Sequence, residues 1–363
     1  VMIPTPCRVV LAALLLLAVA PPAAAQSASR PVVRIESGSL QGVAEGGVQR
    51  FLGIPYAAPP VGALRWRPPQ PAAAWQGVRD ASRHGHACPQ HIGDYDDAWV
   101  NAALQAAGLD EDCLTLTIWA PTPGSGPAPV MFYMHGGNML AGSNVMPLYD
   151  GTVLAREGIV LVVVNYRLGY LGRFGHPALS RLQADEPLVN YGLFDQIAAL
   201  RWVQRNIAAF GGDPGKVTIV GHSAGGVAVN YLMASPAAAG LFHRAIAMGS
   251  GVLIDRSMHY RESLPRGLAG MSSEAVGREF AAHFGIAEGP DAQVAAALRR
   301  IPWSRIVEYQ QAKQRPFNPV VDGKVIVEDL ARVFERGAQH DVPYIGGANS
   351  WESNQIAGIP LIG

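Results

Sequence analysis

The ten residues VTIVGHSAGG, Val217 to Gly226, join a strand-like run to a helix-like one. Val217–Val220 is apolar and β-branched, which is typical of a buried strand, and Gly225–Ala234 has helical character. Between them Gly221-His222-Ser223-Ala224-Gly225 fits the pattern G-x-S-x-G. In this context the pattern predicts a sharp turn that exposes the hydroxyl of Ser223, with glycines where side chains would strike the strand and the helix. The turn also places the N–H of Ala224 at a helix N-terminus, where a developing oxyanion is stabilised.

A second glycine-rich turn follows another strand-like run. Val130–Met134 (VMFYM) is predicted to be a buried strand, and His135-Gly136-Gly137-Asn138 comes directly after it. Backbone N–H groups can approach a carbonyl oxygen closely where glycine leaves room, so this turn predicts further oxyanion donors. An ordinary strand-ending turn is the alternative, but two motifs in this order favour the catalytic interpretation.

Strands and helices alternate over the rest of the chain. Gly192–Phe210 has apolar residues at helical spacing and is followed by the helix stop Gly211-Gly212-Asp213-Pro214. The predicted strands are Leu114–Trp119, Val130–Met134, Ile159–Asn165, Val217–Val220, Arg244–Met248 and Val342–Ile345. This alternation predicts an α/β fold with a central, mostly parallel sheet and helices on both faces.

Two further regions complete the predicted organisation. Val32–Glu36 and Leu40–Ala44 surround Ser37-Gly38-Ser39 and are predicted to form a hairpin. From Asp255 to Arg315 the pattern is helical and irregular, which suggests a cap over one edge of the sheet.

Composition and the N-terminus bear on the location of the protein. The 28 basic residues balance 28 acidic ones, which argues against a nucleic-acid-binding protein. Residues 1–25 have the order of a secretory signal, with Arg8, the apolar run Val9–Ala20 and a small-residue site at Ala23-Ala24-Ala25. We expect the mature chain to begin near Gln26, to be secreted or periplasmic, and not to insert stably into a membrane. An uncleaved anchor is the alternative.

Export also affects the interpretation of the cysteines. Cys7 would leave with the signal, so that Cys88 and Cys113 remain as an even pair in an oxidising compartment. A disulfide between them would close a loop of about 25 residues and contribute roughly 3 kcal/mol in the chain-entropy model. Two free thiols are the alternative.

Taken together, these motifs resemble those of the type-B carboxylesterases, which include cholinesterase-like and para-nitrobenzyl-esterase-like enzymes. The resemblance runs from Gln41 to about Glu352. It is carried by FLGIPYA (51–57), EDCL (111–114), NYRLG (165–169), GLFDQ (192–196) and the stretch from Phe210 to Gly226. It implies the α/β-hydrolase fold for a domain covering residues 26–363.

The resemblance implies roles for individual residues. Ser223 would be the acyl-forming nucleophile, and the N–H groups of Gly137, Asn138 and Ala224 would form the oxyanion hole. Glu352 matches the acid of the catalytic triad, although Trp351 and Ser353 stand where the family has an acidic residue and a glycine. A surface-loop carboxylate is the alternative for Glu352.

Other matches are architectural. Cys88 and Cys113 match the first disulfide of the family. Arg65 with Glu111, and Arg167 with Asp195, match its two structural ion pairs. We interpret these four charges as structural because removing one partner of a buried pair leaves an uncompensated charge.

The chain departs from the family at the general base. The order in this fold is serine, acid, histidine, and none of residues 353–363 is a histidine. The side chain of His222 should point away from that of Ser223, and His135 is expected to orient the glycine-rich turn. We therefore expect the catalytic histidine beyond residue 363 and the hydrolase domain to be incomplete at its C-terminus.

The sequence thus predicts a serine carboxylic ester hydrolase that acts through an acyl-enzyme on Ser223. Its substrate would be a small, neutral and partly apolar ester, and no metal or organic cofactor is implied. The alternatives are a truncated, inactive fragment and a non-catalytic binding or adhesion relative of the same fold. The sequence carries no indication of an oligomeric state.

Overall fold

A computed structural model describes residues 29–93, 98–122, 124, 126–186, 188–250, 258–259, 272–313 and 319–349. The predicted signal peptide and Glu352 lie outside these residues. The described part of the chain has no helix with the length and apolar character that a membrane crossing requires.

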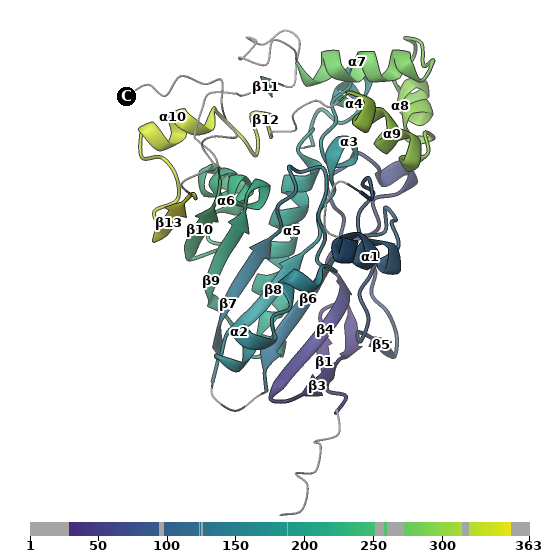
Figure 1. Cartoon of the computed structure of the whole chain (residues 1–363). Coiled ribbons are helices and arrows are strands. Elements are labelled where there is room, and N and C mark those ends of the chain that lie inside the picture. Colours follow the sequence, from purple (N-terminus) through teal and green to yellow (C-terminus); the bar gives the residue numbers. More distant parts are fainter. Residues whose placement is uncertain are drawn as a thin grey trace, which may run out of the picture.

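An eight-stranded sheet forms the centre of the molecule (Figure 1). Its strands, in order across the sheet, are β13 (Tyr344–Gly347), β10 (Arg244–Met248), β9 (Gly212–His222), β7 (Ala128–Met134), β8 (Val160–Val164), β6 (Thr115–Pro121), β4 (Val48–Pro55) and β3 (Val43–Glu45). The first five are parallel, and the last three continue the sheet in antiparallel pairing. The predicted α/β fold with a mostly parallel central sheet is confirmed.

The predicted N-terminal hairpin is confirmed only in its first part. β1 (Val32–Ile35) pairs with β2 (Gly38–Gln41), and β5 (Val78–Asp80) joins them in a small sheet. Residues 43–45 belong instead to β3 of the large sheet, because the chain crosses between the sheets at Gly42. A Cβ at Gly42 would lie 2.6 Å from the carbonyl oxygen of Arg50, so only glycine allows this crossing.

Helices lie on both faces of the central sheet. The α-helices are α1 (Ala98–Ala107), α2 (Thr152–Arg156), α3 (Gly169–Gly172), α4 (Pro177–Leu182), α5 (Tyr191–Asn206), α6 (Ala224–Ala234), α7 (Ser273–His283), α8 (Asp291–Arg299), α9 (Trp303–Lys313) and α10 (Leu330–Glu335). Short 3₁₀ turns are η1 (Gly62–Leu64), η2 (Pro147–Tyr149), η3 (Ile207–Phe210) and η4 (Pro236–Ala238), and β11 (Met258–His259) pairs with β12 (Val320–Val321). The helix predicted at 192–210 therefore becomes 3₁₀ in its last turn, where Gly211 ends it with a φ of 80°.

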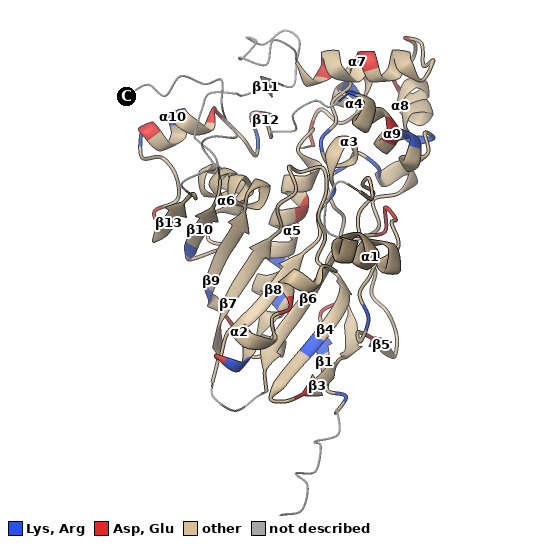
Figure 2. Ribbon diagram, viewed as in Figure 1, with Lys and Arg blue, Asp and Glu red and all other residues tan. Residues whose placement is uncertain are grey.

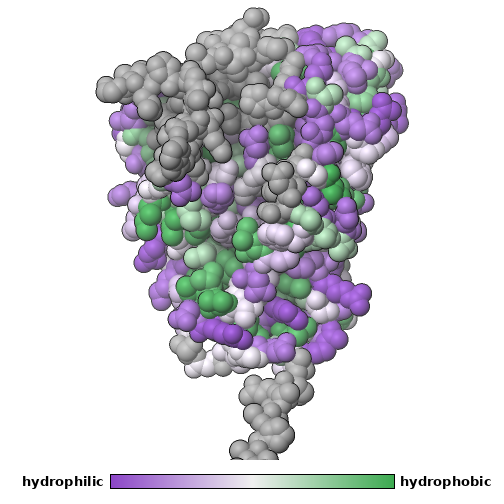
Figure 3. Space-filling model, viewed as in Figure 1, coloured by the Kyte–Doolittle hydropathy of each residue, from purple (hydrophilic) through white to green (hydrophobic). Residues whose placement is uncertain are grey.

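The two faces of β8 contribute to two different cores. Leu161 and Val163 pack in a cluster with Ala155 of α2, whereas the alternate residues of the strand pack in the main core with α5. All five residues of β8 are buried, as predicted for a strand covered on both faces. The α2 side is covered less completely, and Figure 3 shows apolar surface over α2, where Val153 is 70% exposed.

Helices α7, α8 and α9 occupy the described part of the predicted cap region and lie beside α3 and α4 (Figure 1). An aromatic cluster fixes them there. The Trp66 and Phe174 rings are stacked with centroids 4.3 Å apart, and Phe280 of α7 packs against Tyr170 at 5.4 Å. Charged residues of both signs are interspersed on these helices and along the rest of the ribbon (Figure 2).

Candidate active site

Ser223 lies in the turn between the end of β9 and the beginning of α6. Its φ of 54° and ψ of −121° are unfavourable for a residue with a side chain, so the surrounding structure must hold the turn. Two hydrogen bonds do so. The Ser223 N–H donates to the Met248 carbonyl at 2.8 Å, and the Ser223 carbonyl accepts from the Val227 N–H at 2.9 Å. Strand β10 and helix α6 therefore fix the serine from both sides.

The glycines around Ser223 are required by close backbone contacts, as the sequence predicts. A Cβ at Gly221 would lie 2.2 Å from the Gly225 carbonyl carbon, and a Cβ at Gly225 would lie 2.1 Å from the Met134 carbonyl oxygen. Real Cβ atoms do not approach other atoms this closely. The turn can thus form only with glycine at both positions.

The glycine-rich turn after β7 lies directly beside this serine. A Cβ at Gly136 would lie 3.2 Å from the Cβ of Ser223. The following residues Gly137, Asn138 and Met139 have φ values of 106°, 56° and 57°. This backbone turns sharply, and the Gly137 carbonyl closes it by accepting from two N–H groups at 2.9 Å each.

The three predicted oxyanion donors lie in the turn after β7 and at the beginning of α6. Within the described residues, the N–H groups of Gly137, Asn138 and Ala224 donate to no protein acceptor. Ala224 is the first residue of α6, whose N-terminal N–H groups lack intrahelical partners. The structure therefore places Ser223 between one amide donor at a helix N-terminus and the glycine-rich turn after β7, an arrangement that can stabilise a negatively charged tetrahedral oxygen.

His135 packs against the glycine-rich turn that follows it. Its Nδ1 is 2.9 Å from the Gly136 carbonyl oxygen, and its ring stacks on Tyr166 with the centroids 4.4 Å apart. The Tyr166 hydroxyl donates to the His135 carbonyl at 2.6 Å. Burial lowers the pKa of His135 to about 4, so the ring is neutral near pH 7. These contacts agree with the expectation that His135 orients the turn.

Three other described histidines make hydrogen bonds with the backbone. The His243 Nδ1 accepts from the Val217 N–H at 3.2 Å, and the His176 Nδ1 accepts from the Ala178 N–H at 3.1 Å at the beginning of α4. The His340 Nε2 is 2.8 Å from the Ser235 carbonyl oxygen. Among the histidine side chains that the structure describes, none is hydrogen-bonded to the Ser223 hydroxyl.

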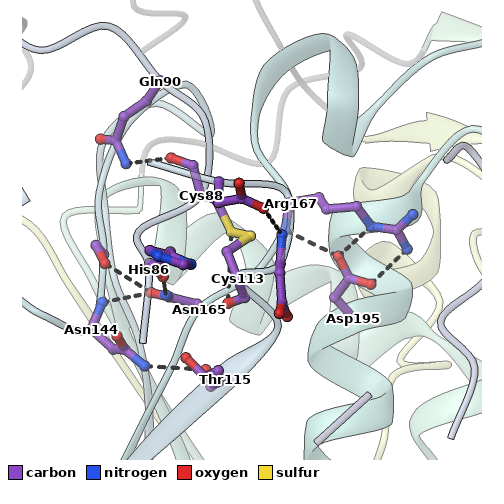
Figure 4. The surroundings of a disulfide bond; sticks show 12 residues. His86, Cys88, Gln90, Cys113, Thr115, Asn144, Asn165, Arg167 and Asp195 are labelled. Carbon is purple, nitrogen blue, oxygen red and sulfur yellow. Dashed lines mark hydrogen bonds and ion pairs between the residues drawn. A yellow bond between two sulfur atoms is a disulfide. The ribbon is translucent and has the colours of Figure 1, made fainter. Parts of the chain in front are cut away.

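The predicted disulfide and the predicted Arg167–Asp195 ion pair lie near each other (Figure 4). Cys88 and Cys113 are bonded through their sulfur atoms. Arg167 donates from Nε and Nη2 to Asp195 at 2.8 and 2.6 Å, and the Asp195 side chain is 0% exposed.

The second predicted ion pair is also formed and buried. The Arg65 Nε donates to the Glu111 Oε1 at 2.7 Å, and the Arg65 Nη2 contacts the second carboxylate oxygen. The Arg65 guanidinium also donates to the carbonyl of Arg299 at 3.0 Å, which ties this pair to the end of α8. The pair therefore joins the N-terminal region of the chain to the helical layer.

Sequence reasoning assigned no role to two buried amide side chains near the disulfide, Gln90 and Asn165. The Asn165 Oδ1 accepts from the Asn144 N–H at 2.7 Å and from the Ser143 hydroxyl at 3.1 Å, and its Nδ2 donates to the His86 carbonyl at 3.1 Å. The only sequence signal was position, since Asn165 ends a buried strand run and Gln90 lies two residues after Cys88.

The described ranges contain no cluster of three or more His, Cys, Asp or Glu side chains that could hold a metal ion.

The buried neutral His135 predicts a specific pH dependence of stability. The His135 side chain has a pKa of 6.5 in the unfolded chain and of about 4 in the folded protein. Between these values the unfolded chain binds the proton more readily, so the free energy of unfolding falls as the pH is lowered from 6.5 towards 4. We expect this loss to be about 3 kcal/mol.

The measurement is urea unfolding of the wild type and of His135→Asn at pH 7 and pH 4. The wild type should lose stability relative to the variant over this range. The exposed His283→Asn is the matched control and should follow the wild type. Parallel pH profiles for the wild type and His135→Asn would contradict the assignment.

The amino-acid sequence is similar to those of known esterases. Residues 29–360 match the family model described as the carboxylesterase family. The chain is 43% identical over 340 residues to the fumonisin B1 esterase of Sphingopyxis macrogoltabida, covering 92% of this chain and 59% of that protein. It is 37% identical over 322 residues to the para-nitrobenzyl esterase of Bacillus subtilis, covering 87% of this chain and 62% of that protein.

Solved structures show the same likeness. The carboxylesterase EST55 of Geobacillus stearothermophilus superposes with a TM-score of 0.75 at 35% identity, covering 90% of this chain and 64% of that one. The chain thus spans about three fifths of the length of the curated relatives it matches.

Proposed function

Because the chain belongs to the carboxylesterase family, we propose that it forms part of a serine hydrolase that cleaves carboxylic esters through an acyl-enzyme on Ser223. The observation that supports this most directly is that two strained turns, one at Ser223 and one at Gly136–Met139, lie against each other. Ser223 is held at a φ of 54°, and the Gly136 turn with its unpaired donors lies against it.

The proposed reaction uses the groups that the site brings together. The Ser223 Oγ attacks the ester carbonyl carbon, and the resulting oxyanion accepts hydrogen bonds from the N–H groups of Gly137, Asn138 and Ala224. The alcohol then leaves, and water hydrolyses the acyl-serine by the same route. We assign Glu352 the role of the triad acid, because it follows β13 in the sequence at the position that the family uses.

We propose that the general base is a residue outside the described histidines, because none of their side chains is hydrogen-bonded to the Ser223 hydroxyl. The serine proton must nevertheless pass to a base for attack to proceed at neutral pH. Because the chain spans about three fifths of the length of these relatives, we propose that activity is a property of the full-length protein.

The remaining features fit an exported hydrolase. A disulfide is typical of an oxidising compartment, and we propose that residues 1–25 direct export. We propose one hydrolase domain from residue 26, with α7–α9 as its cap and a small neutral ester as substrate.

Labelling with a fluorophosphonate probe tests the proposal. The probe reacts only with an activated serine, so we expect rapid, stoichiometric labelling of the native full-length protein at Ser223, located by peptide mass spectrometry. Urea-unfolded protein is the control and should remain unlabelled. A folded protein that takes up no probe would support a non-catalytic binding relative instead.

A further inference from the structure

The turn that carries two of the proposed oxyanion donors is a strained segment. Asn138 and Met139 both have positive φ values, although neither is a glycine. Such residues cost about 1–3 kcal/mol each and persist only where surrounding contacts over-determine them. The contacts that hold this turn therefore also set the directions of its N–H groups.

Gly142 is one of the points at which the rest of the protein holds the turn; another is the Gly169 N–H, which donates to the Met139 carbonyl at 2.7 Å. A Cβ at Gly142 would lie 2.1 Å from the His135 Nδ1 and 2.6 Å from the Gly136 carbonyl oxygen. The backbone of Gly142 thus packs directly on the peptide that begins the turn. A displacement of Gly142 would move the Gly136 peptide and the donors that follow it.

Gln90 binds both polar groups of Gly142. The Gly142 N–H donates to the Gln90 Oε1 at 2.8 Å, and the Gln90 Nε2 donates to the Gly142 carbonyl at 2.9 Å. The same Nε2 also donates to the Cys88 carbonyl at 3.0 Å. The Gln90 side chain is buried, with 2% exposed, and lies beside the disulfide in Figure 4. The segment tied down by the disulfide is therefore hydrogen-bonded to the end of the oxyanion turn.

We propose that Gln90 is a positioning residue for the oxyanion hole, acting through Gly142 on the Gly136–Met139 turn. The proposal rests on the proposed function, because only a reacting ester gives the donors of this turn a catalytic role. A positioned donor matters strongly, since loss of one oxyanion donor costs about 10²-fold or more in rate.

The activity test uses Gln90→Met, which keeps the size of the side chain and removes all three hydrogen bonds. In the full-length protein we expect kcat for a p-nitrophenyl ester to fall about 10- to 100-fold with little change in KM. The matching thionoester should be affected much less, because its sulfur accepts hydrogen bonds poorly. The ratio of oxoester to thionoester rates should therefore fall.

Gln204→Met is the matched control. The Gln204 Nε2 also bridges two backbone carbonyls, those of Pro214 and Leu241 at 3.0 Å each, but it lies on α5 away from the turn. It should lose stability without changing the rate ratio. An unchanged kcat in Gln90→Met, or a fall in kcat with an unchanged oxoester-to-thionoester ratio, would overturn the proposal.

Hydrogen exchange separates this proposal from the proposed function. Amides in peptides covering residues 136–142 should exchange faster in Gln90→Met than in Gln204→Met, whether or not the protein cleaves esters. Unchanged exchange there would refute positioning by Gln90, whereas esterase activity that survives Ser223→Ala would refute the proposed function alone. If Gln90→Met does not fold, Gln90→Glu keeps the acceptor for the Gly142 N–H but places a carboxylate oxygen against the Gly142 and Cys88 carbonyls, and the same ratio should fall.

Discussion

Replacing Ser223 by alanine is expected to lower kcat/KM for an activated ester by about 10⁵-fold or more, leaving only the rate that the oxyanion donors and substrate binding provide. Alanine removes the attacking oxygen and changes nothing else of consequence. The backbone at φ 54° is as unfavourable for serine as for alanine, so the turn should persist. The measurement is the steady-state hydrolysis of a p-nitrophenyl ester by the full-length protein.

Two controls make this result specific. Circular dichroism should show that Ser223→Ala retains the wild-type fold. Ser304→Ala, at an exposed position on α9, should keep wild-type activity. Ester cleavage that survives in a folded Ser223→Ala protein would mean that another group is the nucleophile, and the assignment of the acyl-enzyme to this turn would be abandoned.

The parts of the site that depend on local sterics could be predicted from the sequence. Gly221 is a glycine because of a contact within its own turn, and the strand–turn–helix pattern around Ser223 also predicts Gly225, whose contact comes from the adjoining strand β7. The strands of the parallel sheet were also predictable. The central strand β8 is short, apolar and buried in every residue, which is the pattern that predicts a strand covered on both faces.

The parts that depend on distant contacts could not be predicted in the same way. Gln90 and Gly142 are 52 residues apart, and a side-chain amide that bonds backbone groups leaves no pattern in the sequence. The crossing of the chain at Gly42 is similar, because it depends on the position of Arg50 in the neighbouring strand. The two ion pairs were expected only from the family resemblance, since spacing alone does not indicate which opposite charges meet.

Replacing Asp195 by alanine is expected to destabilise the fold by about 3–5 kcal/mol, because it leaves the Arg167 guanidinium buried without its counter-charge. Arg167 is 4% exposed and Asp195 is 0% exposed, so water cannot solvate the remaining charge. The lost carboxylate also accepts from the Arg167 backbone N–H at 3.0 Å. Because α5 carries Asp195 and the segment after β8 carries Arg167, the pair joins the helix to the strand end beside the candidate site. Urea unfolding of the purified variant gives the free-energy change.

The chain provides a matched comparison at its surface. Arg181 and Asp291 form a two-pronged pair with distances of 2.8 and 2.6 Å, but the Arg181 side chain is 60% exposed. Solvent screens that pair, so Asp291→Ala should cost less than about 1 kcal/mol.

The double variant Arg167→Met with Asp195→Leu should recover much of the stability lost in Asp195→Ala, because it removes both buried charges together. Equal losses for Asp195→Ala and Asp291→Ala would show that burial does not determine the strength of the Arg167–Asp195 pair, and its structural role would have to be reassigned to the packing of α5.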